Sequence, residues 1–251
     1  MNLEDLRKHI DEIDERLFSL LQERLKLVEQ VGRFKKNTAA GKYIIRPGRE
    51  ALKVKKAYQV AREAGYNEKI SKAFASIWRE LISLSINFEE EAKIAFSEKS
   101  PEMLYLLREY FGSYSEKLPY KNDDDALSAL NNRAANIAAF AVQSKPTVEP
   151  WWLKLAGQTE FSIFAEVPLF PLTQPSTLNS HHFLISNVTP EPTGEDKFVY
   201  AASKIPADEL ESFKIISEFK GNYLLLSDEF YNNYQSKLNA KYLGCFATFS
   251  F

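Results

Sequence analysis

The first third of the chain has apolar residues at helical spacing. Between Leu3 and Lys35 they recur every three or four positions, with no proline and with no glycine before Gly32, which predicts one continuous helix. Asn2 and Asp5 are suited to cap its first turn. At 1.5 Å per residue this helix would be about 50 Å long. A helix of that length exceeds what a compact domain normally uses, so we expect it to pack against a partner.

Two shorter helices are predicted to follow. Two glycines and a proline interrupt the pattern and predict a loop over residues 37–48. Helical spacing resumes from about Arg49 to Glu63 and again, after a capping Asn67, from about Glu68 to Lys93. Because three such helices enclose little core alone, two copies are expected to interlock as an obligate dimer. Aromatic residues at helical spacing are expected in the core: Phe18, Phe74 and Trp78.

The pattern changes after Ile94 to short strands separated by Pro, Gly and Asn. Strands are predicted at residues 161–167, 182–188, 197–203, 223–227 and 241–249. Helix-like segments lie at residues 206–214 and 228–238. From Lys197 onward the β-α-β-β-α-β order predicts a ferredoxin-like end to this α/β region.

Composition divides the 251 residues at the same place. Residues 1–94 hold 19 Lys and Arg against 15 Asp and Glu, whereas the remainder holds 13 against 19. Pro47 is the one proline of the first part, and ten others follow it. We therefore predict a multidomain chain, with an all-α three-helix domain at 1–94 and an α/β domain at 95–251. The weak positive charge of the first domain suits a small anionic ligand but not a nucleic acid.

Cysteine usage and hydropathy bear on location. Cys245 is the single cysteine, which excludes a disulfide framework within one chain and favours a reducing compartment. No secretory signal and no stretch able to span a bilayer is recognised. The chain is expected to be cytoplasmic, with no membrane partner.

Three sequence blocks occur in order within the helical part: LRKHIDEIDERLFSLLQERLKLVEQVGRFKK, RPGRE and IWRELISLSINFE. Together they resemble the all-helical class of chorismate mutases over residues 3 to about 92. The resemblance implies a homodimer with shared active sites that converts chorismate to prephenate in aromatic amino acid biosynthesis, with no metal and no cofactor. The implied catalytic residues are Arg24, Lys35, Glu50 and Glu89. The implied substrate-binding residues are Arg7, Arg49, Ser85 and Arg46.

The chemistry of this reaction agrees with those residue types. Chorismate carries two carboxylates, which Arg binds through two parallel hydrogen bonds. The ether oxygen gains negative charge as its C–O bond breaks, and a compact Lys charge can stabilise it. Arg24 and Lys35 are eleven residues apart, about three helical turns, so they share a face. Arg7 is about 100° out of phase with Arg24, so we expect it to serve the partner's site.

Two positions depart from the family pattern. Many members have a glutamine that donates to the ether oxygen, and this chain has Glu89, which can donate only when protonated. Other members have Asp or Asn one turn before the catalytic glutamate, where this chain has Arg46. Glu50 is therefore expected to hold the substrate hydroxyl alone.

The segment HHFLISNVTPEPTGEDKFVYAAS resembles the junction between the catalytic and regulatory parts of prephenate dehydratases. Asn179 and Phe183 match the family's catalytic motif, but His181 and His182 replace its Thr and Arg. The region at 95–251 is therefore interpreted as a degenerate relative without dehydratase activity. Adjacent histidines on a strand point to opposite faces, which disfavours a metal site. The tryptophans of EPWWLKL are expected to anchor the core.

Two other functions remain open. An isochorismate pyruvate-lyase would share the helical fold, although Glu50 and the dehydratase-like tail argue against it. A non-catalytic binding or regulatory protein of the same pathway would require both parts to have lost activity. Charged residues outside the family positions are interpreted as solvated surface: Arg16, Lys26, Arg33 and Lys36.

Overall fold

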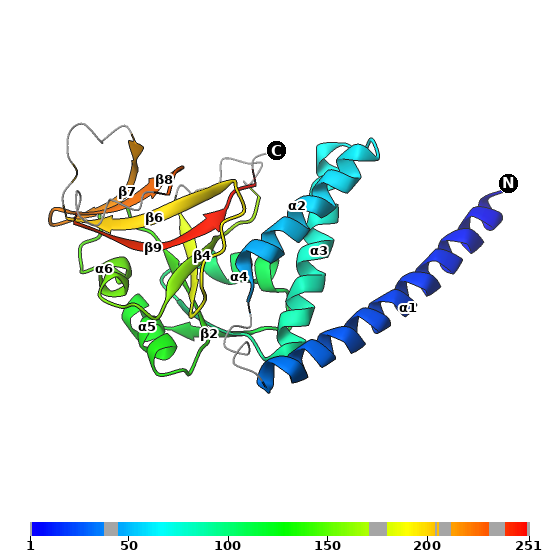
Figure 1. Ribbon diagram of the computed structural model, residues 1–251, viewed down its shortest axis with the longest axis horizontal. Helices are drawn as coiled ribbons and strands as arrows, with labels where there is room; N and C mark the ends of the chain where they lie inside the picture. The colour runs from blue at the N-terminus through cyan, green and yellow to red at the C-terminus, as the bar shows by residue number, and fades with distance from the viewer. Residues whose placement is uncertain are drawn as a thin grey trace.

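The computed structural model describes residues 2–37, 45–170, 180–203, 205, 212–230 and 239–249. Three helices are followed by a mixed α/β region built around one sheet (Figure 1). This order confirms the predicted fold class, a helical N-terminal part and an α/β C-terminal part. No helix in the described part of the chain combines the length and the apolar character needed to cross a membrane.

Helix α1 (Leu3–Lys36) begins at the predicted cap. The Asn2 side chain accepts from the Asp5 amide at 2.9 Å, and the Asp5 carboxylate accepts from the Asn2 amide at 3.0 Å. The helix projects away from the rest of the chain (Figure 1), and every residue from Asn2 to Leu20 is exposed. Its apolar stripe, including Ile10 at 56 % exposure, is therefore left uncovered by the residues that the structure describes.

Helices α2 (Pro47–Glu63) and α3 (Glu68–Glu89) pack side by side. Asn67 caps α3 by accepting from the Ile70 amide, as predicted. The prediction that this helix continues to Lys93 is wrong, because Glu90 has an extended backbone and a strand begins at Lys93. Three consecutive glutamates without a basic residue oppose the negative end of the helix dipole, which favours an end here.

The expectation that Phe18, Phe74 and Trp78 lie in a core is wrong for a single chain. Their exposed fractions are 57 %, 36 % and 43 %. They lie on α1 and α3 and stay open to solvent in the described structure, although Phe74 stacks on Tyr66.

The nine strands form one sheet in the order β2-β1-β3-β5-β4-β9-β6-β8-β7. Their bounds are β1 Lys93–Ser97, β2 Glu116–Tyr120, β3 Ile137–Ala141, β4 Ser162–Glu166, β5 His182–Ser186, β6 Asp196–Ala202, β7 Lys214–Phe219, β8 Asn222–Ser227 and β9 Ala240–Ala247. The five predicted strands are confirmed, whereas β1, β2, β3 and β7 were not predicted.

The last four strands have the antiparallel order β9-β6-β8-β7 that a ferredoxin-like unit requires. Most of the two predicted helical segments, residues 206–211 and 231–238, lies outside the described residues. At Gly244 strand β9 approaches β4 so closely that a Cβ atom would lie 2.1 Å from the Ile163 carbonyl oxygen, and φ is +141°. Only glycine permits this junction between the ferredoxin-like strands and the rest of the sheet.

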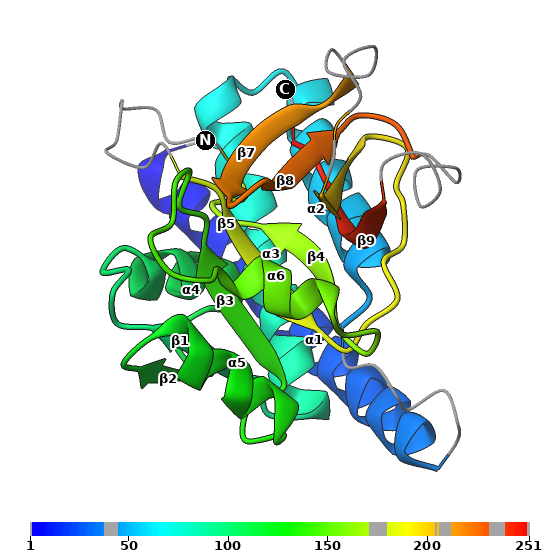
Figure 2. The same ribbon diagram turned by 90° about the vertical axis from the view of Figure 1, so that its left-hand side faces the viewer.

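Helices cover both faces of the sheet (Figure 2). On one face lie α5 (Asp123–Asn131) and α6 (Trp151–Ala156), whose Trp151 and Trp152 are buried core anchors, as expected. On the other face α4 (Met103–Phe111) packs between the sheet and the N-terminal helices.

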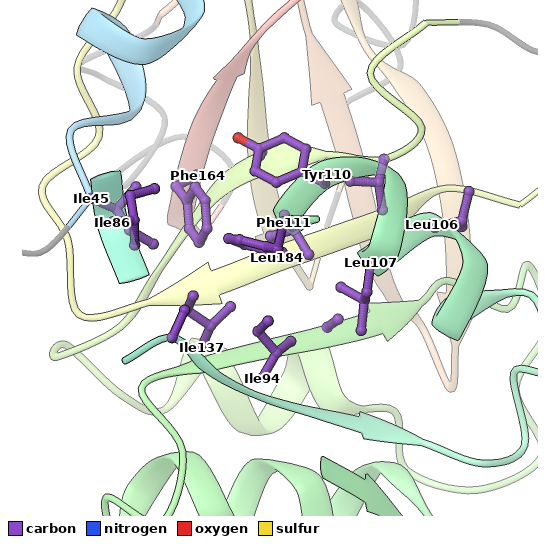
Figure 3. Close-up of a cluster of buried hydrophobic side chains, with 14 of the residues drawn as sticks. Ile45, Ile86, Ile94, Leu106, Leu107, Tyr110, Phe111, Ile137, Phe164 and Leu184 are labelled. Carbon is purple, nitrogen blue, oxygen red and sulfur yellow. The ribbon is translucent and has the colours of Figure 1, made fainter. Parts of the chain in front are cut away.

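One hydrophobic cluster joins the N-terminal helices to the sheet. Ile45 and Ile86 lie beside Phe164, with Phe111 and Leu184 in the same group (Figure 3). Each such fully buried side chain contributes about 1.5–3 kcal/mol relative to an exposed one. The domain boundary between residues 94 and 95 stays a prediction. In the structure this point lies inside β1, next to a hydrophobic core that the N-terminal helices share with the sheet.

Candidate active site

Arg24 connects α1 to α3. Its guanidinium donates to the Ser85 hydroxyl at 2.5 Å and to the Leu81 carbonyl at 3.1 Å. Ser85 is buried, and its hydroxyl also donates to the Leu81 carbonyl at 2.7 Å. Partial burial lowers the pKa of Arg24 from its usual value, because the charged form loses hydration. The guanidinium is therefore a fixed cation near the middle of the α1–α3 contact.

Lys35 lies further along the same contact. Its ammonium forms a 2.6 Å ion pair with Glu89, and both side chains are largely buried. Gly32 of α1 faces this residue, since a Cβ there would lie 3.4 Å from the Glu89 side chain, at van der Waals distance. Arg24, Lys35, Ser85 and Glu89 thus lie along one seam between α1 and α3, which we call the α1–α3 seam. The predicted common face of Arg24 and Lys35 agrees with this arrangement.

Glu50 does not join the α1–α3 seam. It lies in the first turn of α2 and is 8 % exposed. Its carboxylate binds the Arg79 guanidinium at 3.0 Å and accepts from the Arg46 amide at 2.9 Å. In the described part of the chain it has no hydrogen bond or ion pair with Arg24 or Lys35.

The remaining predicted residues lie apart from one another. Arg46, on the loop before α2, binds Glu191 through its side chain at 2.8 and 3.1 Å. Arg49 and Arg7 are both exposed. Arg7 lies in the projecting half of α1, where every residue from Asn2 to Leu20 is exposed.

Arg79 was not identified by sequence reasoning. It is 3 % exposed, and its guanidinium lies 4.5 Å above the Tyr110 ring. Burial raises the pKa of Tyr110 to about 12, so the contact joins a cation to a neutral aromatic ring. The one signal in the sequence was an arginine next to apolar residues in IWRELI, where Trp78 precedes it and Glu80 follows it. Such a residue is normally interpreted as the polar edge of an amphipathic helix.

The two adjacent histidines point to different sides of β5, as the strand alternation predicts. His181 Nδ1 contacts Glu166, and His182 Nε2 lies 2.9 Å from Glu102 at the start of α4. Among the described residues no three His, Cys, Asp or Glu side chains are grouped so as to hold a metal ion. Asn179 lies outside the described residues.

Comparison with known proteins decides the nature of the helical part. Residues 6–90 match the family model described as chorismate mutase type II. The N-terminal helices form a chorismate mutase type II domain. The α1–α3 seam and the first turn of α2 all lie within this chorismate mutase domain.

Two curated relatives are bifunctional chorismate mutase/prephenate dehydratases. The Aquifex aeolicus protein is 27 % identical over 175 residues, which cover 68 % of this chain and 47 % of that protein. The Pseudomonas aeruginosa protein is 27 % identical over 148 residues, which cover 57 % and 39 %. The chain thus spans less than half the length of either. Because both alignments exceed the length of the chorismate mutase domain, similarity continues into the C-terminal region, which resembles prephenate dehydratase.

Part of the chain also matches solved structures. Prephenate dehydratase from Streptococcus mutans gives a TM-score of 0.39 at 16 % identity, covering 63 % of this chain and all of that one. The complex of prephenate dehydratase with L-Phe from Arthrobacter aurescens gives 0.43 at 11 % identity, covering 62 % and 90 %.

Proposed function

We propose that this chain is a chorismate mutase, an isomerase that rearranges chorismate to prephenate in phenylalanine and tyrosine biosynthesis. The observation that carries the proposal is the α1–α3 seam within a chorismate mutase type II domain. Two partly buried cations lie there, eleven residues apart on one helix face. We place the reaction in the cytoplasm, since the single Cys245 is a buried free thiol.

The reaction needs charge stabilisation and little else from the protein. One C–O bond breaks as one C–C bond forms within chorismate, so no group is transferred to the enzyme. Arg24 binds a substrate carboxylate, and Lys35 stabilises the ether oxygen as it gains negative charge. Holding the flexible side chain against the ring supplies the remaining part of the acceleration.

One hydrogen bond and one ion pair keep these two cations oriented before substrate arrives. Arg24 is bound to the Ser85 hydroxyl and Lys35 to the Glu89 carboxylate. A dianionic substrate replaces some of these contacts with its own oxygens. Because the side chains are already partly desolvated, little reorganisation is required during the reaction.

The substrate site is proposed to be completed by a second copy of the chain. The first half of α1 is exposed over its whole circumference, including the apolar stripe and Arg7. A partner helix packed there would bury the stripe, which includes Phe18. We therefore propose a homodimer in which Arg7 contributes to the partner's active site.

A parallel assay with two substrates tests this proposal against its alternatives. Purified full-length chain is given chorismate or isochorismate, and prephenate and pyruvate are measured separately. We expect prephenate from chorismate and no pyruvate from isochorismate. Pyruvate release would instead establish the lyase, and failure to consume either substrate would favour a non-catalytic protein.

Glu89 is expected to make turnover dependent on acid. An ionised carboxylate repels the charge that develops on the ether oxygen, whereas the protonated form donates a hydrogen bond to it. We therefore expect kcat to fall as pH rises. The variant Glu89→Gln keeps a donor that cannot ionise, so its kcat should stay level over the same range. A Glu89→Gln profile that falls in parallel with wild type would assign the pH dependence to another group.

A further inference from the structure

Both oxygens of the Glu50 carboxylate are bound in the described structure. Oε2 accepts from Arg79 at 3.0 Å, and Oε1 accepts from the Arg46 amide at 2.9 Å. A carboxylate has about four lone-pair directions, so two remain for a substrate hydroxyl. These two contacts fix the rotation of the side chain and thereby the direction of the remaining lone pairs.

The first of these contacts is held by the C-terminal region. Arg79 lies 4.5 Å above the ring of Tyr110, which belongs to α4. Ser83, one turn after Arg79, donates to the Tyr110 carbonyl at 2.9 Å and accepts from Arg79 Nε at 3.4 Å. Arg79 and Tyr110 are 3 % and 6 % exposed. The orientation of Arg79, and through it that of Glu50, depends on residues beyond the chorismate mutase domain.

The C-terminal region also fixes the second contact, between the Arg46 amide and Glu50, through a different loop. The Arg46 guanidinium binds Glu191, on the loop between β5 and β6, through two hydrogen bonds. The backbone of this loop also touches the start of α2, since a Cβ at Gly48 would lie 2.5 Å from the Glu191 carbonyl oxygen. The loop thereby fixes the backbone from which the Arg46 amide points to Glu50.

We propose that the C-terminal region positions Glu50 through two contacts, Tyr110 with Arg79 and Glu191 with Arg46, and so sets how tightly the substrate hydroxyl is recognised. This inference rests on the proposed chorismate mutase function. It assigns Arg79 and Glu191 as positioning residues, because each acts through Glu50 or its neighbouring backbone and not on the substrate itself. It also gives Arg46 a role outside substrate contact, since its side chain is engaged by Glu191.

The test compares two inhibitors that differ by one hydroxyl. One is a dicarboxylate analogue of the bicyclic transition state that carries the ring hydroxyl, and the other lacks it. A hydrogen bond to a charged group discriminates between such a pair by about tenfold or more. Wild-type protein should prefer the hydroxylated analogue by that factor, and Glu50→Gln should lose most of the preference.

The variants Arg79→Lys and Glu191→Gln should each lower the preference at least threefold, with binding of the analogue that lacks the hydroxyl unchanged within twofold. Arg79→Lys keeps the positive charge but loses the planar group that lies on Tyr110. Glu191→Gln removes a charge at a partly exposed site, so it should fold even if Arg79→Lys does not.

Matched controls separate positioning from general damage. Glu195→Gln makes the same charge change on the same loop, but Glu195 binds Lys55, further along α2. Tyr110→Phe keeps the ring and the carbonyl that Arg79 and Ser83 use. Both controls should retain the wild-type preference.

Three results would overturn the inference. If Glu50→Gln loses the preference while Arg79→Lys and Glu191→Gln keep it, Glu50 is functional but is not positioned as proposed. If the positioning variants weaken both analogues equally, their role is only structural. If wild-type protein binds neither analogue, the proposed function itself fails, and this inference fails with it.

Discussion

Replacing Lys35 or Arg24 with alanine should lower kcat/KM for chorismate by about 100- to 1,000-fold, the usual effect of removing one preorganised group that stabilises transition-state charge. Both residues are partly buried at the α1–α3 seam, where the dielectric screening of water is weak. Steady-state kinetics with purified variants measures the effect. Most of the loss is expected in kcat for Lys35→Ala, because the ether oxygen gains its charge only in the transition state.

The matched control is Arg33→Ala. Arg33 lies two residues before Lys35 on the same helix, but its side chain is 73 % exposed and pairs with Glu29. It should retain wild-type kinetics within about twofold, as expected for an exposed ion pair. The double variant Lys35→Ala with Glu89→Gln removes the carboxylate that Lys35→Ala leaves unpaired, and it should remain inactive. Near wild-type kcat/KM for Lys35→Ala or for Arg24→Ala would show that the α1–α3 seam is not the catalytic site.

Mixing two inactive proteins should restore activity if the active site is shared between subunits. An Arg7→Ala chain retains Lys35, and a Lys35→Ala chain retains Arg7. In a mixed dimer one of the two sites then receives both intact residues. Random exchange of equal amounts should therefore restore about a quarter of wild-type sites, since half of the dimers are mixed and each has one intact site.

The control for this experiment is proof of subunit exchange, obtained by native mass spectrometry on chains of different mass. A second mixture, of Lys35→Ala with Arg24→Ala, should stay inactive. Each active site takes both Arg24 and Lys35 from one chain, so every site in a mixed dimer still lacks one of them. Mixed dimers that show no recovery in the Arg7 experiment would place Arg7 outside the partner's site.

Much of the fold was predictable because local signals were strong. The Asn2 and Asn67 caps, the uninterrupted spacing of α1 and the apolar, β-branched or aromatic runs of β4, β5, β6, β8 and β9 each depend on neighbouring residues. The unpredicted strands have weaker local patterns. β2 is a short edge strand that contains Pro119 and two charged residues, and β3 is largely alanine. They form strands because the parallel pairing with β1 satisfies their backbone groups.

In the candidate site, too, the sequence predicted only the relations between residues that are close along the chain. The common face of Arg24 and Lys35 follows from helical periodicity, and so does the four-residue spacing of Ser85 and Glu89. The pairing of Glu50 with Arg79 joins residues 29 apart, and that of Arg46 with Glu191 joins residues 145 apart. These pairs depend on how the sheet and α4 pack against the helices, which no local pattern in the sequence specifies.

The most direct test of the account is the conversion of chorismate by purified full-length protein, followed by NMR with catalytic amounts of enzyme. The account predicts stoichiometric formation of prephenate, well above the uncatalysed rate, and loss of that rate in Lys35→Ala protein that keeps the wild-type circular dichroism spectrum. Chorismate that disappears no faster than in buffer, or equally fast with Lys35→Ala, would contradict it.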